Sequence, residues 1–184
     1  NNRQEEVVKI AQQMQETSDS LAYLVRNYVF TGDIQYFEDY WSMELHGEGR
    51  EDVVKKLRSY HFDNEEHKNL NIILDRCNEL KKQEVYAMQL ALAQYHVHAI
   101  DYEDEELQGY IRYVENYDKL PMHEGRNEPG MEQKQDATDY LSGEEYSYCT
   151  QQLSNAIDEF VSQEQNKLDN IAQQNRSISN RAIL

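Results

Sequence analysis

The chain has 184 residues, and its 35 acidic residues against 18 Lys and Arg give a formal net charge of −17. This balance disfavours binding to nucleic acid or to an anionic membrane surface, because both partners carry phosphates that need a basic face. The length predicts a single domain, and a mean hydropathy of −0.95 favours an elongated fold over a globule with a thick core.

Glycine and proline are scarce. The seven Gly and two Pro leave three long stretches, 1–31, 50–108 and 144–184, that contain neither residue. An all-β or doubly wound α/β fold needs these residues repeatedly at its turns, so the sequence predicts an all-α protein with long helices. We expect no membrane span within the chain, because it has no apolar run of about 18 residues.

The first predicted helix covers residues of about 3–31. Its hydrophobic residues repeat every seven positions, which is typical of a helix packed nearly parallel to its neighbours. The repeat consists of Val7, Met14, Leu21 and Tyr28. Gly32 can take the left-handed backbone that ends a helix, and Thr31 or Asp33 can cap the next one. We therefore expect a helical hairpin corner here.

The second predicted helix covers about 33–60, with a break near 46–49 where two glycines interrupt it. The third covers about 64–100 and begins at a capping residue, Asp63 or Asn64, that is followed by two glutamates. Its inward-facing positions again have heptad spacing. They are Leu70, Ile73, Cys77, Leu80, Glu84, Ala87 and Ala91.

An acidic segment of about 101–135 then departs from the heptad pattern and contains both prolines. One short helix is predicted inside it, and the remainder is expected to be an exposed loop. That short helix would contain Leu107, Tyr110, Ile111 and Val114. The last predicted helix covers about 137–183, with hydrophobic positions that include Leu153, Ile157, Phe160, Leu168, Ile171 and Ile178.

The lengths of these segments predict how they pack. At 1.5 Å per residue, the first and third helices are roughly 45 to 55 Å long. Rods of this length favour an up-down antiparallel four-helix bundle, with the 101–135 segment as an extra helix and loop between the third and fourth helices. Both chain ends would then lie at the same end of the bundle. We expect the end helices to continue into two membrane spans; a soluble bundle or coiled-coil segment is the alternative.

One segment resembles a known family. Residues 18–41, SDSLAYLVRNYVFTGDIQYFEDYW, are similar to the start of the four-helix extracytoplasmic sensor domains of bacterial chemoreceptors (methyl-accepting chemotaxis proteins) and of related receptor kinases and diguanylate cyclases. The matching residues are Ser18, Asp19, Leu21, Leu24, Arg26, Tyr28, Val29, Thr31, Gly32, Asp33, Tyr36, Tyr40 and Trp41. Weaker similarity follows at 80–88 and 137–146. The 101–135 segment departs from the family. The basic segment that the family carries just after its second helix is only partly present here, at Arg50, Lys55, Lys56 and Arg58.

The resemblance implies a function. It suggests an extracytoplasmic ligand-sensing domain of a bacterial transmembrane receptor, attached to the cell membrane through flanking spans and forming a homodimer. A small-molecule ligand would displace the first and last helices by ~1 to 2 Å and so change a two-state output in the cytoplasm. The alternative is a structural or interaction module, a helical spacer that binds a protein partner and has no small-molecule pocket.

Catalytic and metal-binding patterns are missing from the sequence. A di-iron bundle needs Glu-x-x-His on two helices, and no Glu is followed by His at that position. His96 and His98 would point to different faces of a helix. No nucleophile lies in a Ser-His-acid or Gly-rich context. We therefore expect no enzyme activity, no catalytic residues, no metal and no cofactor. Cys77 and Cys149 are expected at different heights, which predicts free thiols.

Glu84 is the unusual residue of the predicted core, because it faces inward among Leu, Ile, Cys and Ala. A carboxylate there needs hydrogen-bond donors or a changed protonation state. Arg26, at a similar height, is its expected partner by charge. Two interpretations stay open: a buried polar lock that fixes helix register, or a pocket for a ligand that the acidic composition suggests is cationic or neutral. The candidate ligand-binding residues are Arg26, Tyr28, Tyr36, Tyr40, Trp41 and Glu84.

Overall fold

The computed structural model describes residues 2–118 and 136–183, and these residues form helices and short connections with no strand. The elements are α1 (Asn2–Thr31), α2 (Ile34–Leu45), α3 (Arg50–Arg58), α4 (Asn64–Gln94), the 3-10 helix η1 (Ala99–Asp101), α5 (Glu105–Glu115), α6 (Ala137–Leu141) and α7 (Glu144–Ile183). The predicted all-α class is confirmed for this part of the chain.

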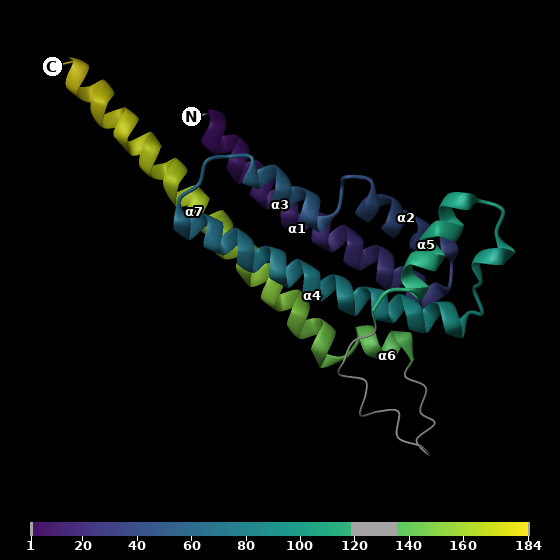
Figure 1. Cartoon of the computed structure of the whole chain (residues 1–184). Coiled ribbons are helices and arrows are strands. Elements are labelled where there is room, and N and C mark those ends of the chain that lie inside the picture. Colours follow the sequence, from purple (N-terminus) through teal and green to yellow (C-terminus); the bar gives the residue numbers. More distant parts are fainter. Residues whose placement is uncertain (1, 119–135, 184) are drawn as a thin grey trace.

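The long helices lie side by side along one axis (Figure 1). Helix α1 packs against α2, α3, α4 and α7, and α4 also packs against α7. Their buried side chains form a narrow core that runs the length of the molecule. Figure 1 shows both chain ends at the same end of the molecule, with the last part of α7 extending past the start of α1.

The corner between α1 and α2 lies at the opposite end. Gly32 has a φ of 72°, the left-handed conformation expected at this position. A Cβ atom at Gly32 would lie 2.7 Å from the Tyr95 ring, so the corner also needs a residue without a side chain. Asp33 caps α2 by accepting a hydrogen bond of 3.0 Å from the amide of Gln35. The Tyr95 hydroxyl donates to the Val29 carbonyl at 2.8 Å, which ties α4 to this corner.

The break between α2 and α3 positions one residue of the site. Gly47 has a φ of 85°, and Gly49 is the N-cap residue of α3. The Asp52 carboxylate accepts the Gly49 amide at 2.9 Å, which closes the first turn of the new helix. Arg50 is therefore the first residue of α3, and its side chain is buried.

Helix α4 ends earlier than the pattern predicted. The helix expected over about 64–100 stops at Gln94, so the prediction is wrong for its last six residues, 95–100. Tyr95 forms the C-cap of α4. His96 follows with a φ of 53°, a left-handed backbone conformation in which an α-helix cannot continue. Helix α4 begins as predicted at Asp63, which accepts the Glu66 amide at 2.9 Å while Glu66 accepts the Asp63 amide at 3.0 Å.

Helix α5 is the short helix expected in the acidic segment, and its inward residues Leu107, Tyr110, Ile111 and Val114 are all buried. It packs against α4 and α2. The loop expected after it lies mostly outside the described residues.

The single helix predicted over 137–183 is wrong, because the chain forms α6 and α7 with a break at Ser142 and Gly143. The five-residue α6 closes when the Gly143 amide donates to the Tyr140 carbonyl at 3.1 Å. Helix α6 contacts α4 and α1, and its residues lie near the last turns of α1.

Candidate functional site

Glu84 forms a buried ion pair with Arg50. Glu84 is 0% exposed and Arg50 is 4% exposed. One guanidinium nitrogen of Arg50, Nη1, bonds to Oε1 of Glu84, and Nη2 donates to Oε2 at 3.1 Å. The planar guanidinium therefore matches both carboxylate oxygens, which is the strongest common arrangement of an ion pair in a protein.

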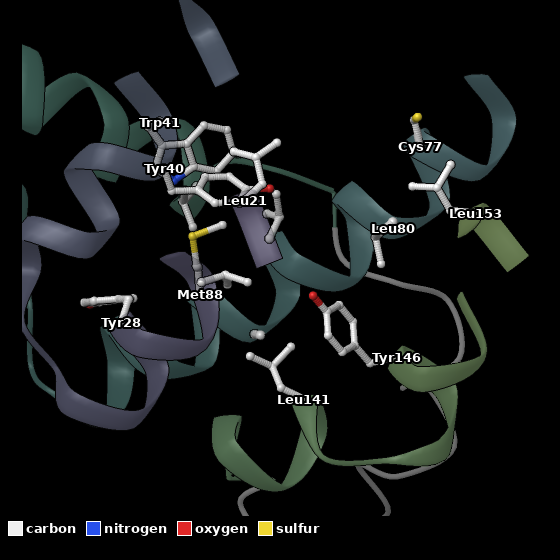
Figure 2. Close-up of a cluster of buried hydrophobic side chains, with 14 of the residues drawn as sticks. Leu21, Tyr28, Tyr40, Trp41, Cys77, Leu80, Met88, Leu141, Tyr146 and Leu153 are labelled. Atoms are coloured by element: carbon white, nitrogen blue, oxygen red, sulfur yellow. The ribbon is translucent and has the colours of Figure 1, made fainter. Parts of the chain in front are cut away.

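Two tyrosines complete the surroundings of the carboxylate. The Tyr40 hydroxyl of α2 donates to Oε1 of Glu84 at 2.9 Å, and the Tyr146 hydroxyl of α7 donates to Oε2 at 2.8 Å. Arg50 also donates from Nε to the Ser18 hydroxyl and from Nη2 to the Ser18 carbonyl, both at 3.1 Å. Side chains from α1, α2, α3, α4 and α7 thus meet around Glu84 and Arg50. Figure 2 shows two of them, Tyr40 and Tyr146, within the cluster of buried side chains.

The surroundings shift the pKa values of the two tyrosines and of Arg50. Burial, followed by the Glu84 carboxylate, raises the pKa of Tyr40 and of Tyr146 well above the ordinary value. Burial alone would lower the pKa of Arg50, but the Glu84 carboxylate outweighs it and raises that pKa. The tyrosines therefore stay neutral donors and the guanidinium stays charged. The arrangement is a polar lock between helices with no unpaired group.

The expected pairing of Glu84 with Arg26 is wrong. Arg26 lies on the exposed side of α1, and its guanidinium is 5.5 Å from the centre of the Tyr146 ring. Arg50 takes the inward position because it is on the buried stripe of α3. That stripe consists of Arg50, Val53, Val54 and Leu57. Their i, i+3, i+4, i+7 spacing is the sequence signal that could have identified Arg50 as an inward-facing cation, and it was missed.

The aromatic candidates lie in the core instead of lining an open cavity. Tyr28, Tyr40 and Trp41 are fully buried, and Tyr36 is half-buried against the ring of Tyr23. Tyr40 and Trp41 pack edge to face with ring centres 4.9 Å apart. Figure 2 shows Tyr28, Tyr40 and Trp41 within the same cluster of apolar side chains. Their main contribution is burial of aromatic surface.

Trp41 also belongs to a group of rings around an internal cation. Lys81 Nζ lies 5.9 Å from the Trp41 ring centre, 5.5 Å from that of Tyr113 and 5.9 Å from that of Tyr117. The Glu44 carboxylate is 3.7 Å away. The contacts join α5 and the residues just after it to α2 and α4, so the aromatic residues at this position hold a lysine of the chain itself.

A surface hollow lies between α1 and α6. It has a volume of about 280 Å³. Its lining residues are Arg26, Asn27, Val29 and Phe30 of α1, Thr138 and Leu141 of α6, and Ser142. The ion pairs found among residues 2–118 and 136–183 do not include Arg26. An exposed guanidinium without a carboxylate partner therefore faces a hollow with hydroxyl, amide and apolar groups.

The side chain of Tyr146 connects the hollow at Arg26 to the buried ion pair of Glu84 and Arg50. The ring of Tyr146 stacks under Arg26, and its hydroxyl bonds to Glu84. Tyr146 lies in the first turn of α7. A group that binds Arg26 would thus act on the residue that anchors the beginning of α7.

Other site types were not found in the described parts of the chain. No group of three His, Cys, Asp or Glu residues there has metal-site geometry. Cys77 and Cys149 are free, as predicted, and burial raises the pKa of Cys77 to about 12, which makes it a poor nucleophile. None of the helices described is long and apolar enough to cross a bilayer. No model of a protein family matches the chain, and comparison with curated proteins and with solved structures gave no match either.

Proposed function

We propose that the chain is the ligand-sensing domain of a bacterial transmembrane signal-transduction receptor. Its fold would be an up-down antiparallel four-helix bundle, in which α1, the α2–α3 pair, α4 and α7 are the four rods and α5 is an insertion. The similarity of residues 18–41 to chemoreceptor sensor domains supports this assignment. Attachment through flanking membrane spans, an extracytoplasmic location and a homodimer belong to the same proposal.

The observation that carries the proposal is Arg26, which lines the hollow between α1 and α6 and forms no ion pair with the described residues. A guanidinium with several donors in one plane matches a carboxylate, and the neighbouring hydroxyls of Thr138 and Ser142 can bond to further polar atoms of a ligand. The local guanidinium outweighs the overall acidic balance, which suggested a cationic or neutral ligand. We therefore assign the ligand to the small organic carboxylates.

The signal would pass through Tyr146. A bound carboxylate would compete with the Tyr146 ring for Arg26 and change the packing of the first turn of α7. Glu84 and Arg50 hold the other side of that tyrosine in place. A helix anchored at this point can shift along its length relative to α1, and a shift of ~1 to 2 Å is of the size that biases a two-state output.

A thermal-shift screen against mono-, di- and amino-carboxylates tests this proposal, followed by calorimetric titration of the compounds that stabilise the protein. We expect at least one carboxylate to stabilise the wild type, with the effect lost in Arg26→Ala. Arg76→Ala removes an exposed arginine of α4 and is the matched control, because it should keep the effect. Failure of every carboxylate to stabilise the protein, or equal binding by Arg26→Ala, would contradict the proposal.

The alternative function, a helical spacer that binds a protein partner, is favoured by the packed interior around Glu84. The carboxylate of Glu84 is surrounded by protein donors and leaves no space for a ligand there. The two functions differ at the hollow, because only the sensing function predicts that a carboxylate binds at Arg26. The screen above separates them.

A further inference from the structure

A second buried acidic cluster lies where α7 passes the beginning of α4 (Figure 1). Glu164 of α7 is 0% exposed and Glu66 of α4 is 1% exposed. The Gln4 amide of α1 donates to Oε2 of Glu164 at 2.7 Å and to its carbonyl at 3.1 Å. Three helices therefore meet at these two carboxyl groups, close to the end of the molecule that carries both chain ends.

The charges of the cluster do not balance. Lys167, one turn further along α7, bonds to Glu66 and lies 3.4 Å from the Asp63 carboxylate. Lys167 is the cation that bonds to the carboxyl groups of Glu66 and Asp63. The group facing Glu164 from α1 is the neutral Gln4 amide. The cluster thus contains three carboxyl groups, those of Asp63, Glu66 and Glu164, beside the ammonium group of Lys167. Two of them, Glu66 and Glu164, are buried.

One oxygen of this cluster has no hydrogen-bond partner. Oε1 of Glu164 is buried and makes no hydrogen bond to any donor in the described structure. Glu66 is within hydrogen-bond reach of Glu164, but two carboxylates cannot bond to each other without a proton. A single proton on Glu164 supplies the missing donor and removes the uncompensated charge at the same time.

We propose that Glu66 and Glu164 form a proton-binding site, in which one shared proton holds α7 against α4 and its loss loosens α7 at the point where this helix extends past α1. The site is separate from the hollow at Arg26 and does not depend on the ligand proposed there. The chain would then respond to pH as well as to the proposed ligand. The proton would bind at Glu164, further along α7, whose beginning lies beside the hollow.

The surroundings of Glu164 determine the pH range over which this site releases its proton. Burial, then the hydrogen bond to Glu66, raises the pKa of Glu164 to about 7, against the lowering effects of Gln4 and Lys167. With a pKa of about 7, the site is expected to be mostly protonated at pH 6 and mostly deprotonated at pH 8. Above the transition two buried carboxylates repel each other across the α4–α7 contact.

Two measurements on the 184-residue chain without ligand test the proposal. Carbon-detected NMR of the glutamate side chains gives the titration midpoint of Glu164, which we expect about 2 to 3 pH units above that of an ordinary glutamate. Amide hydrogen exchange over residues 160–175, corrected for the intrinsic effect of pH, should show α7 better protected at pH 6 than at pH 8.

Glu164→Gln keeps the shape of the protonated side chain and cannot ionise, so the pH dependence of α7 protection should disappear in this variant. Glu159→Gln makes the same change at an exposed position of α7 and should behave as the wild type. The proposal is overturned if Glu164 titrates below about pH 5.5, or if Glu164→Gln retains the wild-type pH dependence. The titration of the wild type decides the question even if the variant does not fold.

Discussion

A buried glutamate lies at two places in the molecule, Glu84 in the middle and Glu164 near the chain ends, and the two differ in the groups that surround the carboxyl group. In the middle, the Glu84 carboxylate accepts bonds from Arg50, Tyr40 and Tyr146. Near the chain ends, Glu164 has one neutral donor and one oxygen without a partner. Both glutamates are fully buried, so the two sites differ in the number of donors around the carboxyl group and not in burial.

The largest expected effect is loss of the lock. Glu84→Ala leaves the Arg50 guanidinium buried and unpaired, which should lower the free energy of unfolding by about 3 to 5 kcal/mol in urea denaturation. The double variant Arg50→Met, Glu84→Leu removes both charges and should recover much of this loss. Glu79→Ala on the exposed face of α4 is the control and should change stability little. A small loss in Glu84→Ala would show that the ion pair does not lock the helices.

The two tyrosine hydroxyls should matter less than the arginine. Tyr40→Phe and Tyr146→Phe each remove one donor from the buried carboxylate, so we expect losses of about 1 to 3 kcal/mol in the same measurement. Tyr148→Phe, at an exposed position of α7, is the matched control. Effects no larger than that of the control would mean that Arg50 alone satisfies Glu84.

The stability of the wild type should depend on pH through Glu164. Since its pKa is raised to about 7, the proton stabilises the folded state fully below the ordinary glutamate pKa. This contribution is lost as the pH rises through about 7. Allowing for screening by solvent, we expect the wild type to lose about 1 to 3 kcal/mol between pH 5 and pH 8 relative to Glu164→Gln. Parallel pH profiles of the two proteins in urea denaturation would contradict this.

The smallest expected effect is a shift in the pKa of Glu164 when the charge of Lys167 is removed. Its charge lowers the pKa of Glu164, so Lys167→Gln should move the NMR midpoint of Glu164 upward by roughly half a pH unit to one unit. Lys68→Gln, at an exposed position of α4, keeps the same net charge as Lys167→Gln and should leave the midpoint in place. A downward shift in Lys167→Gln would show that Lys167 does not act on Glu164 through its charge.

The periodic features of the fold could be predicted from the sequence. Heptad spacing and the scarcity of Gly and Pro indicated the long helices, and the corner glycine and the pair before α3 indicated the breaks. The end of α4 at Gln94 and the division of α6 from α7 were missed. Tyr95, the C-cap of α4, is held by a tertiary contact with the Val29 carbonyl, which local patterns do not contain. The break before α7 has a local signal in Gly143, whose amide bonds to the Tyr140 carbonyl.

The site could be predicted only in part. The inward position of Glu84 follows from its heptad, but its partner depends on which arginine the break before α3 turns inward. Glu164 carried the same kind of signal, since it lies four residues after Phe160 on the buried stripe of α7. The hollow at Arg26 depends on α6 and the break after it, which no periodic pattern indicates.

The most direct test of the proposed function is an amide-resolved NMR titration of the chain with the carboxylate that stabilises it most. The account predicts shift changes at residues around Arg26 and Ser142, together with changes that continue from Tyr146 along α7. Changes confined to residues away from the α1–α6 hollow, or changes at the hollow that do not extend into α7, would contradict it.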